Sequence, residues 1–294
     1  MYTITGATGN IGSKITKILL DKGGKVKVIA RTAANLKKFV DRGAEAAAGD
    51  AEDSKFLTNA FIGAEAIFTM IPPNYQANDF RAYQNRFSAS IAAAIKNSGV
   101  TYVVNLSSQG ADMPEGTGPI KGLHDQEQRL NKLEDVNIIH LRCAYFMENL
   151  LMNIPLIKNS GIMGSAIMGD LKFPMIATKD IAAVAADYLI KHNFSNKSIR
   201  DLLGQRGVSL NEAATVIGKK IGKPDLKYVQ FPYDQAEKGL LQAGLSPDVS
   251  RLFVEMSKAF NEGLIKFQRR TPENTTPTSL EEFADFFVQV YKSS

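Results

Sequence analysis

Three glycines, Gly6, Gly9 and Gly12, stand three residues apart near the start of the chain. Residues 2–5 before them have strand-forming side chains, and residues 11–20 after them have apolar side chains at helical spacing. A glycine turn that leaves a strand and opens a helix presents free N–H groups, which suit phosphate. Gly6 would permit the tight turn, Gly9 the approach of a pyrophosphate, and Gly12 the close packing of the helix on the sheet. The sequence therefore predicts a dinucleotide-binding turn.

Other residues of the same turn should add contacts to the phosphates. Thr8 and Asn10 carry polar side chains beside the glycines, and Ile11 stands where the helix begins and its free amides face the ligand. The alternative is a glycine-rich turn that binds nothing. It is disfavoured because all three spacings and both flanking elements agree.

The residue that ends the second predicted strand indicates which dinucleotide is bound. NAD-binding units usually carry an acidic residue there, about 20 residues after the glycines, to accept bonds from the ribose hydroxyls. This chain has Arg31, whose guanidinium cannot accept such bonds but suits a 2′-phosphate. Lys37 or Lys38 is expected to assist. The sequence therefore favours NADP(H) as cofactor, the alternative being that Arg31 is only a solvated charge.

The ends of three later predicted strands should also line the cofactor site, because parallel strands present their carboxyl ends at one edge of a sheet. The expected contacts are Asp50 and Ala51 beside the adenine, Ile71, Pro72, Pro73 and Asn74 beneath the ribose and nicotinamide, and Ser107 and Ser108 near the nicotinamide.

These residues need a scaffold of alternating strands and helices, which the first half of the sequence predicts. Strands are expected at 2–5, 25–30, 45–48, 66–71, 102–106 and 137–141, and helices at 11–20, 35–42, 54–61, 79–98 and 125–133. Repeated strand–helix–strand units with apolar strands indicate an α/β fold, a doubly wound parallel sheet of the Rossmann type.

The alternation weakens after Arg142, and a smaller, helix-rich C-terminal lobe is expected there. Its predicted helices are 179–191, 210–221, 232–244, 253–263 and 280–291. The expected division is a dinucleotide-binding domain at 1–150 and a substrate-binding lobe at 151–294, interleaved with the sheet.

Composition narrows the function classes. The 294 residues carry a formal net charge of +5 spread along the chain, so no nucleic-acid partner is expected. One cysteine allows no internal disulfide, and three histidines without a ligand cluster predict no metal site. Apolar runs are far shorter than the roughly 20 residues of a membrane span, so no membrane partner is expected. No signal peptide is recognisable before the first strand, and a cytoplasmic location is expected.

Four segments carry a family resemblance. The glycine turn is similar to that of extended and atypical short-chain dehydrogenases. Residues 141–149, LRCAYFMEN, resemble the signature segment of the NmrA-like family, and residues 176–182 and 216–223 resemble two later elements of that family. Taken as a whole, the sequence most resembles the bacterial NAD(P)H:quinone oxidoreductases of this family. The resemblance implies that the N-terminal sheet holds NADP(H) and that the C-terminal lobe covers a cleft over the nicotinamide. It also leaves open a non-catalytic role, since the family contains nucleotide sensors that act through partner proteins.

The residues expected to do chemistry depart from the short-chain dehydrogenase pattern. Those enzymes use a Tyr-x-x-x-Lys pair, in which the lysine lowers the tyrosine pKa. By alignment Ile120 stands at the tyrosine position and His124 at the lysine position. His124 is the candidate catalytic proton donor, because histidine exchanges protons near neutral pH. The alternative roles for His124 are that it is only a residue at the start of a helix or that it contacts the cofactor. Lys121 could contact the nicotinamide ribose or simply be solvated.

Residues just after the strand at 137–141 should line the cleft. Tyr145 is expected beside the cofactor, and Phe146 and Asn149 beside the substrate, where Phe146 could stack on a flat ring. The alternative for Phe146 is ordinary packing between the two lobes.

Two hypotheses follow. The first is an NADPH-dependent oxidoreductase that transfers hydride to a quinone or a similar flat electrophile, with the proton supplied by His124 or water. The second is an NADP(H)-sensing regulator that acts through a protein partner. An epimerase or dehydratase is weakened by the missing tyrosine. A small-molecule substrate is expected, and a homodimer is compatible with the sequence.

Overall fold

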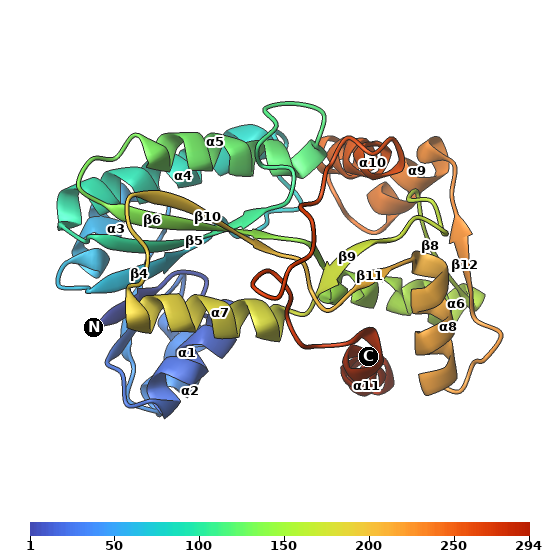
Figure 1. Ribbon diagram of the computed structural model, residues 1–294, viewed down its shortest axis with the longest axis horizontal. Coiled ribbons are helices and arrows are strands. Elements are labelled where there is room, and N and C mark those ends of the chain that lie inside the picture. Colours follow the sequence, from blue (N-terminus) through green and yellow to red (C-terminus); the bar gives the residue numbers. More distant parts are fainter.

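The computed structural model describes residues 1–294 and is built around a seven-stranded sheet whose strands are all parallel (Figure 1). The strand order is β10-β6-β5-β4-β1-β2-β3. The strands are β1 (Tyr2–Ile4), β2 (Val26–Ala30), β3 (Glu45–Ala48), β4 (Ala66–Thr69), β5 (Tyr102–Ser108), β6 (Asn137–Cys143) and β10 (Lys197–Leu202).

Helices cover both faces of this sheet, as the doubly wound prediction requires (Figure 1). One face carries α1 (Gly12–Asp21), the short α2 (Lys37–Val40) and α7 (Thr178–Lys191); the other carries α3 (Ser54–Phe61), α4 (Phe80–Ser98) and α5 (Lys121–Asn131). Each face has its own apolar core, with Ile15 and Leu19 of α1 in one and Ile91 and Ile95 of α4 in the other. The predicted fold class is confirmed.

The order of the strands creates one crevice at the carboxyl edge of the sheet. From β1 the chain moves outward to β2 and β3, and then returns to the other side of β1 to form β4. The connections after β1 and β4 therefore diverge, and ligands of doubly wound sheets bind at such a switch point. The glycine turn follows β1 directly, so it lies at this crevice.

The C-terminal lobe combines helices with two small sheets, β11-β9-β7 and β12-β8. Its elements are β7 (Tyr145–Phe146), α6 (Ile154–Ser160), β8 (Ile162–Ser165), β9 (Phe173–Ile176), β11 (Gly207–Val208), α8 (Leu210–Lys220), β12 (Lys227–Gln230), α9 (Tyr233–Gln242), α10 (Pro247–Asn261) and α11 (Leu280–Ser293). The five predicted C-terminal helices are present. These strands of two to four residues and the seven-residue α6 were not predicted, because segments this short show too little periodicity.

Two helices begin earlier than their apolar periodicity predicted. The helix expected at 253–263 starts at Pro247, where Ser246 accepts a hydrogen bond from the Val249 amide and caps it. The helix expected at 125–133 starts at Lys121, so His124 lies within its first turn. In both cases a proline at or near the start provides the signal that periodicity alone does not.

Two elements beyond residue 150 return to the main sheet. Helix α7 packs beside α1 on one face, and β10 pairs with β6 at the edge (Figure 1). A long connection then runs from α10 to α11, and its Thr278 binds the buried carboxylate of Asp180 on α7 through both amide and hydroxyl. The two parts of the chain are thus interleaved. No helix combines the length and the apolar character that crossing a membrane requires.

His140, on β6, should make the fold sensitive to mild acid. Its Nδ1 accepts from the Asn105 side-chain amide at 3.0 Å and its Nε2 donates to the Asn131 side-chain carbonyl at 2.9 Å, which satisfies the neutral ring. Burial lowers the pKa of His140 to about 4. Between pH 6.5 and 4.5 the unfolded chain takes up a proton here and the folded chain does not, so about 2 to 3 kcal/mol of stability should be lost.

This loss can be measured as the free energy of unfolding in urea at pH 7 and at pH 4.5. His140→Gln, which cannot take up a proton, should show a clearly smaller difference between the two values. An equal difference in both proteins would refute the assignment to His140.

Candidate functional site

The glycine turn has the geometry that its spacing predicted. Gly6 has a φ of +62°, which residues with a Cβ adopt at a cost. A Cβ on Gly12 would lie 2.3 Å from the Gly6 carbonyl oxygen, and a Cβ on Gly6 would lie 2.6 Å from the sulfur of Met70. The start of α1 therefore rests directly on the turn, and the turn rests on the residue that follows β4.

The turn presents unused hydrogen-bond donors to the crevice. The amides of Thr8, Asn10 and Ile11 donate no hydrogen bond within the chain, and no side chain caps the start of α1 at Ile11. Thr8 and Asn10 are exposed. Free amides at the positive end of a helix dipole form a binding site for an anion such as a pyrophosphate. The residues present therefore fit a dinucleotide.

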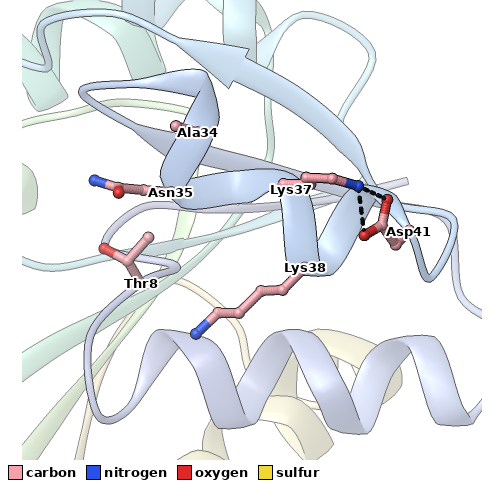
Figure 2. Close-up of a pocket in the computed structure, with 6 residues that line it drawn as sticks. All are labelled: Thr8, Ala34, Asn35, Lys37, Lys38 and Asp41. Carbon is pink, nitrogen blue, oxygen red and sulfur yellow. Dashed lines mark hydrogen bonds and ion pairs between the residues drawn. The ribbon is translucent and has the colours of Figure 1, made fainter.

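A hollow of about 440 Å³ lies between the glycine turn and the segment after β2 (Figure 2). It is lined by Thr8, Ala34, Asn35, Lys37, Lys38 and Asp41. Lys37 turns away and pairs with both oxygens of Asp41 at 2.8 Å. Lys38 makes no ion pair and extends across the hollow toward the helix that follows Thr8. Of the two lysines proposed from the sequence, only Lys38 has no acidic partner, and its ammonium lies 4.9 Å from the centroid of the Phe39 ring.

Arg31 lies at the end of β2, is exposed and makes no ion pair. Its charge acts on Tyr83 of α4, together with the charges of Glu52 and Asp50. Burial and Glu52 raise the pKa of Tyr83 to about 12, and Arg31 opposes this shift. Arg31 and Asp50 follow the neighbouring parallel strands β2 and β3, and the expected contact of Asp50 with the adenine stays a prediction. Tyr83, which was not predicted, donates to the Pro72 carbonyl at 2.9 Å.

The segment after β4 runs along the crevice as expected. Ile71 is buried, Pro72 is half-buried, and Pro73 and Asn74 are exposed. Ala51 is half-buried beside the exposed Asp50. The exposed positions are accessible to a ligand, and the contacts of all these residues with a cofactor stay a prediction.

The two serines that end β5 differ in their surroundings. Ser107 is buried and its hydroxyl donates to Glu127 of α5 at 2.5 Å, so this side chain faces α5. The same carboxylate binds Arg142 through two hydrogen bonds of 3.0 and 2.6 Å. Ser108 is half-buried and its hydroxyl donates to the Gln109 carbonyl at 3.0 Å. Of the two, Ser108 is the one with a side chain partly open to the crevice.

His124 lies in the first turn of α5 and is half-buried. Its Nδ1 is 2.9 Å from the Ala111 carbonyl oxygen, and its Nε2 makes no hydrogen bond within the chain. Because a carbonyl can only accept, Nδ1 carries a hydrogen and Nε2 is the free nitrogen. Lys121, three residues earlier, pairs with Glu255 of α10 at 3.0 Å. Its ammonium thus ties α10 to the start of α5.

The residues after β6 face in different directions. The ring of Tyr145 packs edge-on against Phe173 and Phe260, with centroids 5.4 and 6.2 Å away, and burial raises the pKa of its phenol. Phe146 is half-buried and packs against the core that contains α1 and α7. Asn149 is half-buried in the 3-10 segment after β7, and its side-chain amide makes no hydrogen bond within the chain. Tyr145 therefore belongs to the aromatic core of the C-terminal lobe, and Phe146 lies where that lobe meets the sheet.

A glycine turn of this geometry, at the switch point of a doubly wound sheet, defines the class of Rossmann-fold proteins. Within it, the chain belongs to the NmrA-like family, whose model matches residues 2–284. The family resemblance seen in the sequence is confirmed.

Similar proteins are named as reductases. The NAD(P)H azoreductase of Xenophilus azovorans is 27% identical over 260 residues, which cover 87% of this chain and 86% of that protein. The structure of Citrobacter sp. triphenylmethane reductase complexed with NADP(H) matches with a TM-score of 0.82 at 19% identity, over 99% of this chain and 100% of that one. An NADPH-dependent quinone oxidoreductase from Escherichia coli, complexed with NADPH, matches with a TM-score of 0.75 at 22% identity, over 97% and 99%. At such identities the two structures establish the shared fold.

Proposed function

We propose that the protein is an NADPH-dependent oxidoreductase that reduces a quinone or another flat, electron-poor molecule. The observation that carries the proposal is the pair of unpaired cations, Arg31 and Lys38, beside the free amides of the glycine turn. Free amides suit a pyrophosphate, and two unpaired cations suit an additional phosphate on the adenine ribose. Related proteins named as NAD(P)H azoreductase and quinone oxidoreductase support the reaction class.

When bound, NADPH supplies a hydride to the acceptor. In this proposal the amides of Thr8, Asn10 and Ile11 hold the pyrophosphate, and Arg31 and Lys38 hold the 2′-phosphate. The segment from Ile71 to Asn74 supports the other half of the cofactor. Each hydride delivered to a quinone must be matched by one proton to give the hydroquinone.

The acceptor side of the proposal places three groups around that reaction. In this proposal the half-buried ring of Phe146 stacks on the acceptor, the side-chain amide of Asn149 binds it, and Nε2 of His124, which has no partner in the chain, carries the proton. Holding a flat acceptor against the cofactor supplies much of the rate, because it converts an encounter into a reaction within one complex.

A second candidate function is a nucleotide sensor that regulates a partner protein. The observation in its favour is Ile120, which by alignment stands at the tyrosine position and is buried with no polar group to offer. Such a sensor would bind NADPH and leave it unoxidised.

One assay separates the two functions. The protein is mixed with NADPH and a panel of quinones and azo dyes, and the absorbance of the reduced cofactor is followed. The reductase should oxidise NADPH well above the protein-free background with at least one acceptor. Tight NADPH binding without turnover on any acceptor would exclude the reductase and support the sensor.

A further inference from the structure

Three side chains beneath the glycine turn join three separate elements. Lys14 lies in the first turn of α1, Thr178 is the first residue of α7, and Glu148 lies in the 3-10 segment Met147–Asn153 after β7. Both carboxylate oxygens of Glu148 accept from the Thr178 amide at 3.0 Å, and the Thr178 hydroxyl donates to Oε1 of Glu148. The Lys14 ammonium donates to that hydroxyl at 3.1 Å and to the Asn10 carbonyl at 2.7 Å. A continuous chain of hydrogen bonds therefore ends on the glycine turn.

The pairing of two short strands brings Glu148 and Thr178 together. In the parallel pair of β7 and β9, Tyr145 lies opposite Met175 and Phe146 opposite Ile176. Continuing the register by two residues places Glu148 beside Thr178, which is 1% exposed. The contact thus follows from the backbone of the C-terminal lobe rather than from flexible surface side chains.

Lys14 holds the backbone on the far side of the anion-binding amides. The Asn10 carbonyl and the Ile11 amide belong to one planar trans peptide, so they point in opposite directions. By holding the carbonyl, Lys14 fixes the direction of the Ile11 N–H, which donates to no group in the chain. Burial lowers the pKa of Lys14, and the nearby Glu148 carboxylate opposes this shift.

We propose that Lys14 is a positioning residue of the cofactor cradle, and that Thr178 and Glu148 hold it in place. The inference rests on the proposed binding of NADPH at the glycine turn. Lys14 acts through the Asn10 carbonyl on the amides that receive the pyrophosphate. Since NADPH, NADH and ADP-ribose all contain that pyrophosphate, losing Lys14 should weaken the binding of all three by a similar factor. Substitution of Arg31 or Lys38, by contrast, should weaken the binding of NADPH alone.

The test measures dissociation constants of NADPH, NADH and ADP-ribose by titration calorimetry on the full chain. Lys14→Met should raise each constant about tenfold, the size expected for losing one charged hydrogen bond. Thr178→Val should raise them less, and Thr178→Ser, which keeps the hydroxyl, should restore wild-type values. Adding Thr178→Val to Lys14→Met should change little, because both act through one contact.

Three results would overturn the proposal. They are unchanged constants in Lys14→Met with an unchanged melting temperature, unchanged constants with a lowered melting temperature, which is a purely structural effect, and a rise for NADPH alone. If Lys14→Met fails to fold, the test rests on the dissociation constants of Thr178→Val and Thr178→Ser, and wild-type constants in Thr178→Val would then overturn the proposal. Wild-type protein that binds the nucleotides but reduces no acceptor refutes the reductase and leaves this inference standing; wild-type protein that binds none refutes both.

Discussion

Arg31→Glu is expected to weaken NADPH binding about a hundredfold while leaving NADH binding almost unchanged, the factor corresponding to the loss of one or two charge-assisted hydrogen bonds. Arg31 is exposed at the end of β2 and has no acidic partner, so its guanidinium is free to bind a 2′-phosphate. Glutamate replaces that cation with an anion and can accept bonds from ribose hydroxyls. The measurement is the dissociation constant of each nucleotide. An unchanged preference for NADPH would remove Arg31 from the cofactor site.

The two neighbouring lysines provide a matched control for this experiment. Lys38→Met should weaken NADPH binding about tenfold without affecting NADH, because a single charged contact to the 2′-phosphate is lost. Lys37→Met removes the same charge from the neighbouring residue, but the Lys37 ammonium is paired with Asp41 and turned away from Thr8 (Figure 2). It should change NADPH binding little. Equal effects of the two substitutions would indicate general attraction by positive charge rather than a built phosphate site.

Local sequence predicted the features that depend on adjacent residues. The spacing of Gly6, Gly9 and Gly12 requires a particular turn, and the structure explains it by the close approach of Gly12 to the Gly6 carbonyl. The strand pattern before the turn and the helical pattern after it predicted that the turn lies at the edge of a parallel sheet. The doubly wound fold followed from the same alternation.

Features that join distant residues were not predictable in this way. Strand β10 completes the main sheet although Ile199 is 51% exposed and polar residues interrupt its pattern, since an edge strand lacks a second neighbour. The partner of Lys121 is Glu255, 134 residues away. Ser107 ends a strand as predicted, yet its hydroxyl faces Glu127 because of how α5 crosses the sheet.

The same limit applies to the choice between Lys37 and Lys38. The sequence offers two adjacent lysines after β2, and both line the hollow, but only Lys37 forms an ion pair. Lys37 forms an ion pair with Asp41, one turn further along the helix, so its charge is already neutralised within the chain. Composition alone gives no such information, because it assigns both residues the same charge.

His124→Gln is expected to lower the turnover number for a quinone about a hundredfold if this residue supplies the proton, the lower end of what general acid catalysis contributes. The substituted glutamine fills much of the same space, but its amide cannot exchange a proton. In the wild type Nδ1 is held by the Ala111 carbonyl, so donation from Nε2 requires the doubly protonated ring.

A second substitution distinguishes proton donation from mere support of the helix. His124→Ala leaves a space at the same place, and added imidazole should restore part of its rate by entering that space and carrying the proton. The glutamine side chain fills the space, so imidazole should not help His124→Gln. A wild-type rate in both variants would show that water delivers the proton, since the positioning of a flat acceptor over the nicotinamide would then account for catalysis without a dedicated acid.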